Sequence, residues 1–300
     1  MHRLSDAFRD PVLEGCQSAA VFRLPARHEA SYERNRANLP LGRTDWWAVS
    51  DHRLRRIDTH FARYVDDGRL PGWLVAVTRG GHLAHLSTYG RRNLEDDLPI
   101  EEDTVFRIYS MTKPITSVAA LTLLEEGAIA LTDPISRWLP AFADTEVYVG
   151  GAGDDIVTTP LTEPIRVWHL MTHTAGLTYG FERVHPVDER YRATGYEFGA
   201  PKGVDLAGAC EAWARFPLLF QPGSAWAYSV STDVLGRLIE VVTGQDLATV
   251  VAERVLAPLG MDDTGFGLPE AKRDRLAGLY IPGEGRRATR FDALGPVSRT

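Results

Sequence analysis

The pattern of apolar and polar positions first becomes regular between Val49 and Asp67. Apolar side chains recur there at intervals of three and four residues, which places them on one face of a helix. They are Leu54, Ile57, Phe61, Tyr64 and Val65. Gly68 and the Pro71-Gly72 pair follow, and residues of these types are typical of a helix end. The pattern therefore predicts an amphipathic helix over residues 49–67.

Two strand-like runs come next, from Trp73 to Thr78 and from His82 to Tyr89. The tripeptide Arg79-Gly80-Gly81 between them suits a tight turn, so we expect an antiparallel hairpin. His82 and His85 lie three positions apart in the second run. Because side chains alternate faces along a strand, we expect these histidines to serve in packing rather than to share a metal ion.

The pattern changes from strand-like to helical at Ser110. Residues 110–126 fit a helix, and Pro114 is acceptable because it lies in the first turn. Positions 118–124 are apolar almost all round, so this helix is expected to be buried between layers. Gly127 ends it.

Shorter patterns fill the rest of the chain. Helices are expected near residues 133–139, 166–171, 206–216 and 234–242. Gly244 ends the last of these, whereas Thr145 to Glu163 is polar and glycine-rich and is expected to be a loop. Residues 1–45 have no sustained period and are expected to form an N-terminal arm. The order of helix, hairpin and mostly helical middle favours an α+β fold, with a helical lobe inserted into a sheet-bearing one.

Composition narrows the class of protein. The chain has 300 residues, 44% of them apolar and 24% charged, which is typical of a globular protein rather than a disordered one. The net charge of −7 comes from interleaved acidic and basic residues, so nucleic acid is not an expected partner. Cys16 and Cys210 are too few for a disulfide framework or a Cys-rich zinc site. Without an evident secretory signal or an apolar stretch that could span a bilayer, we expect a cytoplasmic protein that has no membrane partner.

The tetrapeptide Ser110-Met111-Thr112-Lys113 carries the clearest chemistry. Residues three apart share a helix face, so the lysine amine can approach the serine hydroxyl. A serine becomes a strong nucleophile when a neighbouring base takes its proton, and a lysine can do so when burial and nearby cations lower the pKa of its amine. Lysine is also rare here, since Lys113, Lys202 and Lys272 are the only three among 33 basic residues. The alternative is a helix-capping serine followed by an incidental lysine.

A second element lies at Trp226-Ala227-Tyr228-Ser229, after the turn Phe220-Gln221-Pro222-Gly223. A tyrosine held beside a lysine can relay a proton, because the cation stabilises the phenolate. Taken alone, a tyrosine at such a corner is usually a packing residue.

Together these residues resemble the β-lactamase-like serine hydrolases, which include class C β-lactamases, DD-peptidases, esterases and acyltransferases. The resemblance runs from about Leu54 to Phe266 and adds two phrases to the motifs above. These are Leu170-Met171-Thr172-His173-Thr174-Ala175-Gly176-Leu177 and Pro258-Leu259-Gly260-Met261. It implies the two-lobed β-lactamase-like fold, with an antiparallel sheet flanked by helices and a mostly helical lobe.

The resemblance also implies roles for particular residues. Ser110 would be the nucleophile, Lys113 the shared proton acceptor and Tyr228 the acid and base of acylation and deacylation. His173 would be a structural, hydrogen-bonded residue, and Gly176 a turn residue in a conformation open to glycine. The implied lobes are a sheet lobe of residues 46–109 with 256–300 and a helical lobe of residues 110–255, with the Ser-x-x-Lys helix where the lobes meet.

Two departures from the family pattern affect the expected function. Val230 stands where the family has an asparagine that contacts amide substrates, which favours esters, with Ser229 or Ser231 as partial substitutes. The late Lys-Thr-Gly, His-Thr-Gly or Trp-x-Gly motif is missing, and Val242-Thr243-Gly244 is a poor replacement. We therefore expect the sheet of this chain to lack its C-terminal strands and the 300 residues to be part of a longer protein.

The function expected from these features is that of a serine carboxylesterase on small ester or amide substrates, without a cofactor or metal. A β-lactamase, DD-peptidase or acyltransferase on the same machinery is the first alternative. A non-catalytic protein that is acylated without turnover is the second, and the missing late motif favours it. The sequence has no Gly-x-Ser-x-Gly, His-Glu-x-x-His, P-loop or dinucleotide-binding motif.

Overall fold

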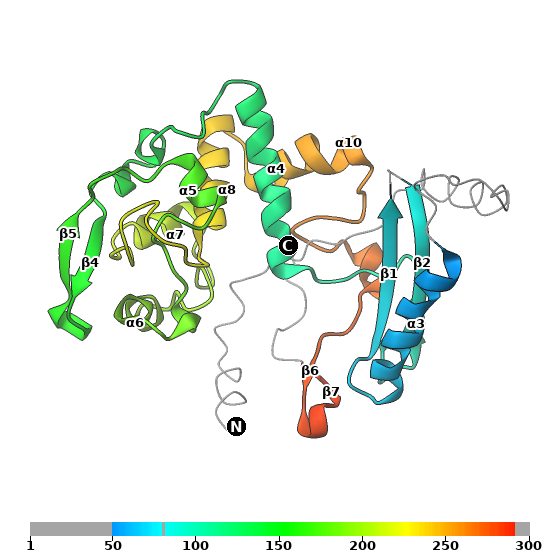
Figure 1. Ribbon diagram of the computed structural model, residues 1–300. Coiled ribbons are helices and arrows are strands. Elements are labelled where there is room, and N and C mark those ends of the chain that lie inside the picture. The colour runs from blue at the N-terminus through cyan, green and yellow to red at the C-terminus, as the bar shows by residue number, and fades with distance from the viewer. Residues whose placement is uncertain (1–49, 80–81, 292–300) are drawn as a thin grey trace. The chain divides into compact units, whose positions relative to one another are not determined.

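The computed structural model describes residues 50–79 and 82–291 of the chain (Figure 1). The expected N-terminal arm and the Gly80-Gly81 turn lie outside the described residues. The chain divides into two compact units. One runs from Tyr109 to Pro258, and the other combines residues before Tyr109 with residues from Leu259 onward. We refer to them as the helical unit and the sheet unit.

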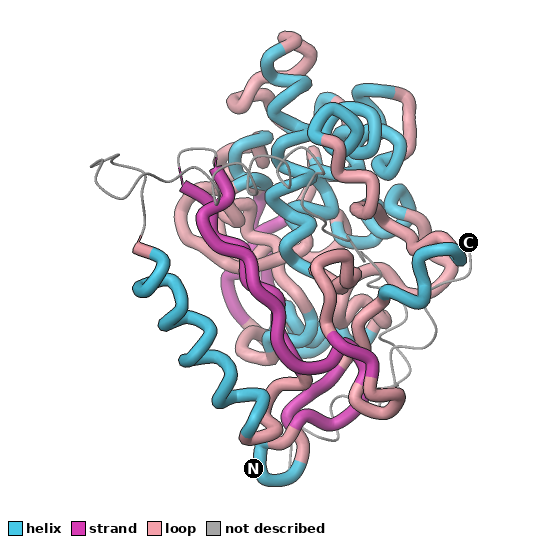
Figure 2. The backbone as a smooth tube through the Cα atoms, turned by 90° about the vertical axis from the view of Figure 1, so that its right-hand side faces the viewer, coloured by secondary structure: helices cyan, strands magenta, loops and turns pink. Residues whose placement is uncertain are grey.

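The sheet unit is built on one helix and a three-stranded antiparallel sheet with the order β1-β2-β3. Its elements are α3 (Asp51–Asp66), β1 (Gly72–Arg79), β2 (His82–Asn93), β3 (Leu98–Pro99), the 3-10 helices η8 (Glu270–Arg275) and η9 (Glu284–Arg286), and the hairpin β6 (Tyr280–Pro282) and β7 (Ala288–Arg290). Helix α3 lies along the β1–β2 hairpin (Figure 2). The predicted helix and hairpin are therefore confirmed, with the register Val75 opposite Ser87.

The helical unit is built around α8, and other helices pack against the buried, mainly apolar face of α8. Its helices are α4 (Thr112–Glu125), α5 (Val167–Met171), α6 (Pro186–Ala193), α7 (Leu206–Trp213), α8 (Ser231–Thr243), α9 (Leu247–Val251) and, at its end, α10 (Ala257–Leu259). The 3-10 helices are η2 (Tyr109–Met111), η3 (Ile135–Arg137), η4 (Pro140–Phe142), η5 (Gly153–Asp155) and η6 (Gly180–Glu182), and Ala252–Leu256 form a π-helical turn, η7. Four fully buried side chains of α8 form the centre of the core, where α4, α5, α7 and α9 pack against it. They are Val234, Leu235, Leu238 and Ile239.

The expectation of a loop over residues 145–163 is wrong. Strands β4 (Glu146–Gly150) and β5 (Val157–Pro160) pair there as an antiparallel hairpin. The side chain of Val147 is 3% exposed and pairs through a bridge with buried Leu218, whereas Val149 is 57% exposed. One buried face is enough to stabilise the hairpin, and the glycines that made the segment resemble a loop lie at the end of β4 and in its connection to β5.

Within the helical unit, α4 is covered on one face, whereas the sequence predicts a helix buried between layers. Its buried side chains are Thr112, Thr116, Ala119, Ala120 and Leu123. Val118 and Leu121, on other faces, are 45% and 39% exposed. The small side chains of the buried face allow α4 and α8 to approach closely.

The described parts of the chain have the α+β character that the pattern predicts, since helices occur together with small antiparallel sheets. Among the described helices, none combines the length and the apolar character needed to cross a bilayer. Gly244 ends α8 with φ of 71°, as its position after the last helical residue predicts.

Candidate active site

Ser110 lies in a tight turn at the start of α4. The residue before it, Tyr109, has φ of 42°, a left-handed conformation that is uncommon for a residue with a side chain. Such a conformation costs about 1–3 kcal/mol and persists where the surrounding structure holds it, often at functional sites. The turn η2 then leads into α4 and leaves Ser110 exposed. The backbone therefore presents this hydroxyl at the beginning of a helix.

Lys113 contacts Ser110 directly. Its Nζ donates a hydrogen bond to Ser110 Oγ at 3.2 Å. Both side chains lie on one face because the turn before α4 continues into the helix without a break. The approach that the spacing predicts is confirmed, and the amine is placed to exchange a proton with the hydroxyl.

Tyr228 reaches the same lysine from the loop before α8. Lys113 Nζ lies 4.8 Å from the centre of the Tyr228 ring and 5.7 Å from the centre of the Tyr179 ring. Both distances are within the range of a cation–π contact. The structure thus brings Ser110, Lys113 and Tyr228 together, and their roles in catalysis stay a prediction.

His173 supports the loop that carries Tyr228. Its carbonyl oxygen accepts a hydrogen bond from the amide of Ala227 at 3.0 Å, and its Nδ1 lies 3.3 Å from Ser229 Oγ. Burial, and then the charge of Lys113, lower the pKa of His173 to about 4. The ring is therefore neutral at pH 7 and bound within the protein, which fits the structural role implied by the family resemblance.

The residues after Tyr228 are turned into the core. Ser229, Val230 and Ser231 are all 0% exposed. The two serine hydroxyls lie 2.7 Å apart and hydrogen bond to each other. The idea that either serine partly replaces the missing asparagine as a substrate contact is therefore wrong, because both hydroxyls are buried. Val230 is likewise enclosed, at the start of α8.

Gly176 holds the segment between His173 and Tyr179 in place. Its φ is 86°, and a Cβ there would lie 2.5 Å from the carbonyl oxygen of Phe220. Its own carbonyl accepts a hydrogen bond from Leu219 at 2.7 Å. The predicted glycine conformation is confirmed, and it allows these two segments to pair closely.

Two further residues lie near Lys113 and belong to none of the sequence motifs described above. Tyr179 is 5% exposed, and its hydroxyl donates to a carboxylate oxygen of Asp233 at 3.5 Å. Burial raises the pKa of Asp233 above its usual value, and the charge of Lys113 offsets this only in part. The only sequence signal for Asp233 was an acidic residue in the first turn of a helix, where carboxylates are common. Sequence reasoning missed both residues.

A second Ser, His and Asp cluster lies in the sheet unit. Asp58 Oδ1 accepts from Ser87 at 2.7 Å and lies 2.8 Å from His85 Nε2, which is itself 3.1 Å from Ser87 Oγ. In a catalytic relay the carboxylate and the serine contact different ring nitrogens, whereas here both contact Nε2. This cluster attaches α3 to β2, as expected for a histidine used in packing.

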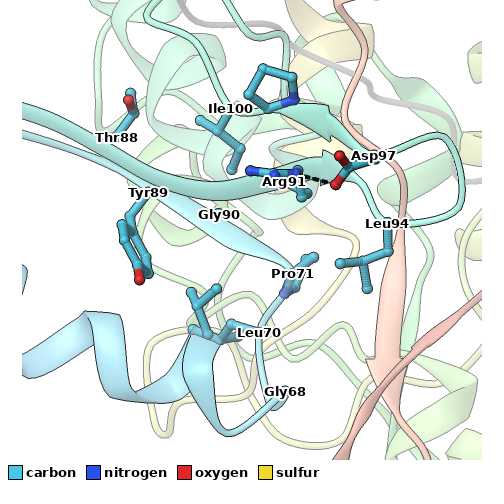
Figure 3. Close-up of a pocket in the computed structure, with 12 residues that line it drawn as sticks. Gly68, Leu70, Pro71, Thr88, Tyr89, Gly90, Arg91, Leu94, Asp97 and Ile100 are labelled. Carbon is cyan, nitrogen blue, oxygen red and sulfur yellow. Dashed lines mark hydrogen bonds and ion pairs between the residues drawn. The ribbon is translucent and has the colours of Figure 1, made fainter.

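A cavity of about 580 Å³ also lies in the sheet unit, where α3 ends and β2 meets β3 (Figure 3). Its walls are mainly apolar, from residues such as Leu70, Leu94 and Ile100. The Arg91 guanidinium at its side donates to the Asp97 carboxylate at 2.5 Å, so the two charges compensate each other. Within residues 50–79 and 82–291, no three His, Cys, Asp or Glu side chains are grouped as metal ligands.

Comparison with known proteins identifies the family. The Beta-lactamase family model matches residues 57–297. Protein Rv1367c of Mycobacterium tuberculosis is 38% identical over 231 residues, which are 77% of this chain and 56% of that protein. Esterase EstB of Burkholderia gladioli is 36% identical over 230 residues, 76% of this chain and 55% of EstB.

A solved structure gives the same result. EstCE1, described as a hydrolase with promiscuous acyltransferase activity, aligns with a TM-score of 0.68 and 30% identity. The alignment covers 79% of this chain and 58% of EstCE1. The chain thus spans little more than half the length of these relatives. With a family model matching most of its residues and a solved relative sharing its fold, the chain belongs to the Beta-lactamase family and has the β-lactamase-like fold.

Proposed function

We propose that this protein is a serine hydrolase that forms an acyl-enzyme at Ser110 and acts as a carboxylesterase on small esters. The observation that carries the proposal is the contact of Lys113 Nζ with Ser110 Oγ at 3.2 Å. The similarity to Esterase EstB and to the hydrolase EstCE1 supports ester substrates.

In the proposed reaction, neutral Lys113 takes the proton of Ser110 as Oγ attacks the ester carbonyl carbon. The tetrahedral intermediate collapses, and the leaving alkoxide takes the proton from the Lys113 ammonium and departs as the alcohol. Water then attacks the acyl-enzyme carbonyl and gives a proton to Lys113. The bond between the acyl carbon and Ser110 Oγ breaks, Oγ takes that proton back, and the carboxylic acid leaves. Tyr228, next to the Lys113 amine, relays protons between the amine and the reacting oxygens.

The chain's own organisation supports placing this chemistry in the helical lobe. We assign residues 110–255 to that lobe and residues 46–109 with 256–300 to the sheet lobe, and the unit boundaries at Tyr109 and Pro258 support this division. The proposed substrates are small molecules, and no cofactor takes part in these steps. The interleaved acidic and basic residues do not favour binding of nucleic acid. We also propose a cytoplasmic location.

Acyl transfer is the second candidate. Acyltransferase activity is named for EstCE1 alongside hydrolysis, and the same acyl-enzyme would serve if an alcohol replaced water in the second step. Product analysis with a competing alcohol distinguishes the two, because transfer yields a new ester whereas hydrolysis yields only the acid.

The test compares hydrolysis of p-nitrophenyl butyrate and of a chromogenic cephalosporin by the full-length protein and by its Ser110→Ala variant. We expect ester turnover in the wild type, little cephalosporin turnover, and a loss of at least about 10³-fold in the variant. Ser117→Ala, on the same helix, is the matched control and should keep wild-type activity. Equal activity of wild type and Ser110→Ala would refute the assignment, and a single burst without turnover would indicate a non-catalytic acyl-binding protein.

A further inference from the structure

We propose that Asp233 is a positioning residue for the reaction at Ser110, acting as the counter-ion of Lys113. Its carboxylate would stabilise the ammonium that forms when Lys113 takes the serine proton. The inference rests on the proposed function, and it assigns a role to a residue outside the Ser-x-x-Lys and tyrosine elements.

The packing of two helices places Asp233 beside the catalytic lysine. Asp233 lies in the first turn of α8, and α8 packs against α4, which carries Lys113. Tyr179 lies between the two charged groups. Its ring centre is 5.7 Å from Lys113 Nζ, while its hydroxyl donates to the Asp233 carboxylate at 3.5 Å. Tyr179 thus holds the carboxylate and faces the amine at the same time.

The pKa of Asp233 depends on the charge of Lys113. Burial raises the pKa of Asp233, which alone would favour the uncharged acid. The positive charge of Lys113 is the largest influence in the opposite direction, and the hydrogen bond from Tyr179 acts the same way. Burial outweighs these influences, so the pKa of Asp233 stays above its usual value, and a positive charge that forms on Lys113 favours the charged form of the carboxylate.

Several other titratable groups of the described residues lie near this pair. On α7, the buried thiol of Cys210 has a raised pKa, first from its burial and then from the charge of Asp233. One turn further along α8, Arg237 pairs with Glu240 at 3.0 Å. The uncharged ring of His173 and the phenol of Tyr228 are also close to the lysine.

The contribution to catalysis follows from the charge change during acylation. As Oγ attacks, the proton moves from Ser110 to Lys113, and the amine becomes a cation. A fixed carboxylate stabilises that cation more than it stabilises the neutral amine, so it lowers the barrier rather than only the energy of the resting enzyme. The same carboxylate makes the amine harder to deprotonate beforehand, which sets the pH at which activity begins.

The experiment measures the pH dependence of kcat/KM on p-nitrophenyl butyrate and of Ser110 labelling by a fluorophosphonate. In Asp233→Asn we expect the acid limb of both profiles to move to lower pH by about one unit, and the plateau rate to fall about tenfold. Tyr179→Phe, which keeps the ring and removes the hydroxyl, should shift the limb in the same direction by less. Because both variants act through one carboxylate, the double variant should be no slower than Asp233→Asn.

The controls separate this role from a structural one. Glu211→Gln removes an exposed carboxylate from α7, which packs on α8, and should leave both profiles unchanged. A folded Asp233→Asn protein with lower activity but an unmoved acid limb would overturn the inference. If Asp233→Asn does not fold, an unmoved limb in Tyr179→Phe overturns it instead. If the wild type itself is not labelled at Ser110, the proposed function fails and the inference fails with it.

Discussion

The backbone at His173 shows how single residues shape the candidate site. His173 has φ of 57°, so it adopts the left-handed conformation that asparagine and glycine accept most readily. This conformation lets its carbonyl bind the loop of Tyr228 while its ring contacts Ser229. Its neutral imidazole is therefore part of the support for Lys113 and Tyr228.

The low pKa of His173 predicts a pH dependence of stability. Its pKa is about 4 in the folded protein against an ordinary value of 6.5, so between these values the unfolded chain binds more protons. Stability contributed by the neutral ring is complete above pH 6.5 and is lost as the pH falls through 4. His173→Asn accepts the same backbone conformation without titrating. Between pH 7 and 4.5 this variant should lose about 1 kcal/mol less than wild type, since residual hydration reduces the full effect.

Urea unfolding at several pH values measures this difference. His60→Asn, at an exposed position of α3, is the control and should follow the wild-type pH dependence. Parallel curves for wild type and His173→Asn would contradict the prediction.

At the scale of elements, buried polar contacts determine how α3 lies on the sheet. Asp58 receives hydrogen bonds from Ser87 and His85, and His85 is only 7% exposed. Burial raises the pKa of Asp58, but the bonds from these two residues outweigh it and leave the pKa below its usual value. Aromatic contacts from Phe61 to Trp73 and from Trp73 to Tyr89 complete the contact between helix and strands.

Asp58→Ala should weaken the attachment of α3 to β2. The change leaves the buried His85 ring without its carboxylate partner, which costs about 2 kcal/mol. Amide hydrogen exchange of α3 and β2 should accelerate, while that of α8 stays as in wild type. Asp66→Ala on the same helix is the matched control, since Asp66 bonds only to the exposed Tyr89 hydroxyl at 2.9 Å among its described contacts. Equal acceleration in both variants would rule out a special role for Asp58.

At the scale of the molecule, the sheet unit joins two segments that are far apart in the sequence. Val105 and Leu276 form a parallel bridge, and Leu268 packs with both. Arg275 donates to the Asp263 carboxylate through two nitrogens, at 2.7 and 3.0 Å. Its guanidinium also reaches the carbonyl of Asp103 at 3.3 Å, so one side chain connects the two segments.

Asp263→Asn should therefore destabilise this unit, by roughly 2 kcal/mol because charged hydrogen bonds to Arg275 and Lys272 are lost. The cations hold the pKa of Asp263 at about 2, most strongly through the hydrogen bond of Arg275. Because its folded pKa is below its ordinary value of 3.8, the stability it contributes is present above about pH 4 and is lost as the pH falls toward 2. The wild type and the variant should converge in thermal melts near pH 2. A constant difference from pH 7 to pH 2 would contradict this origin.

The amino-acid sequence by itself determined the local features. The helix ended by Gly68, the hairpin of β1 and β2 and the contact of Lys113 with Ser110 were all predictable. Each depends on side chains within a few residues of one another, where periodicity, turn chemistry and helix spacing dominate. The Beta-lactamase family membership also followed from short motifs.

Only the tertiary structure decided the features that join distant segments. Val147 belongs to a strand because Leu218 buries one of its faces, and α4 has one covered side because α8 packs there. Asp233 lies beside Lys113, which is 120 positions earlier in the chain, because α4 and α8 pack together and Tyr179 contacts both side chains. Long-range packing and burial give these residues their environment, and no local pattern records it.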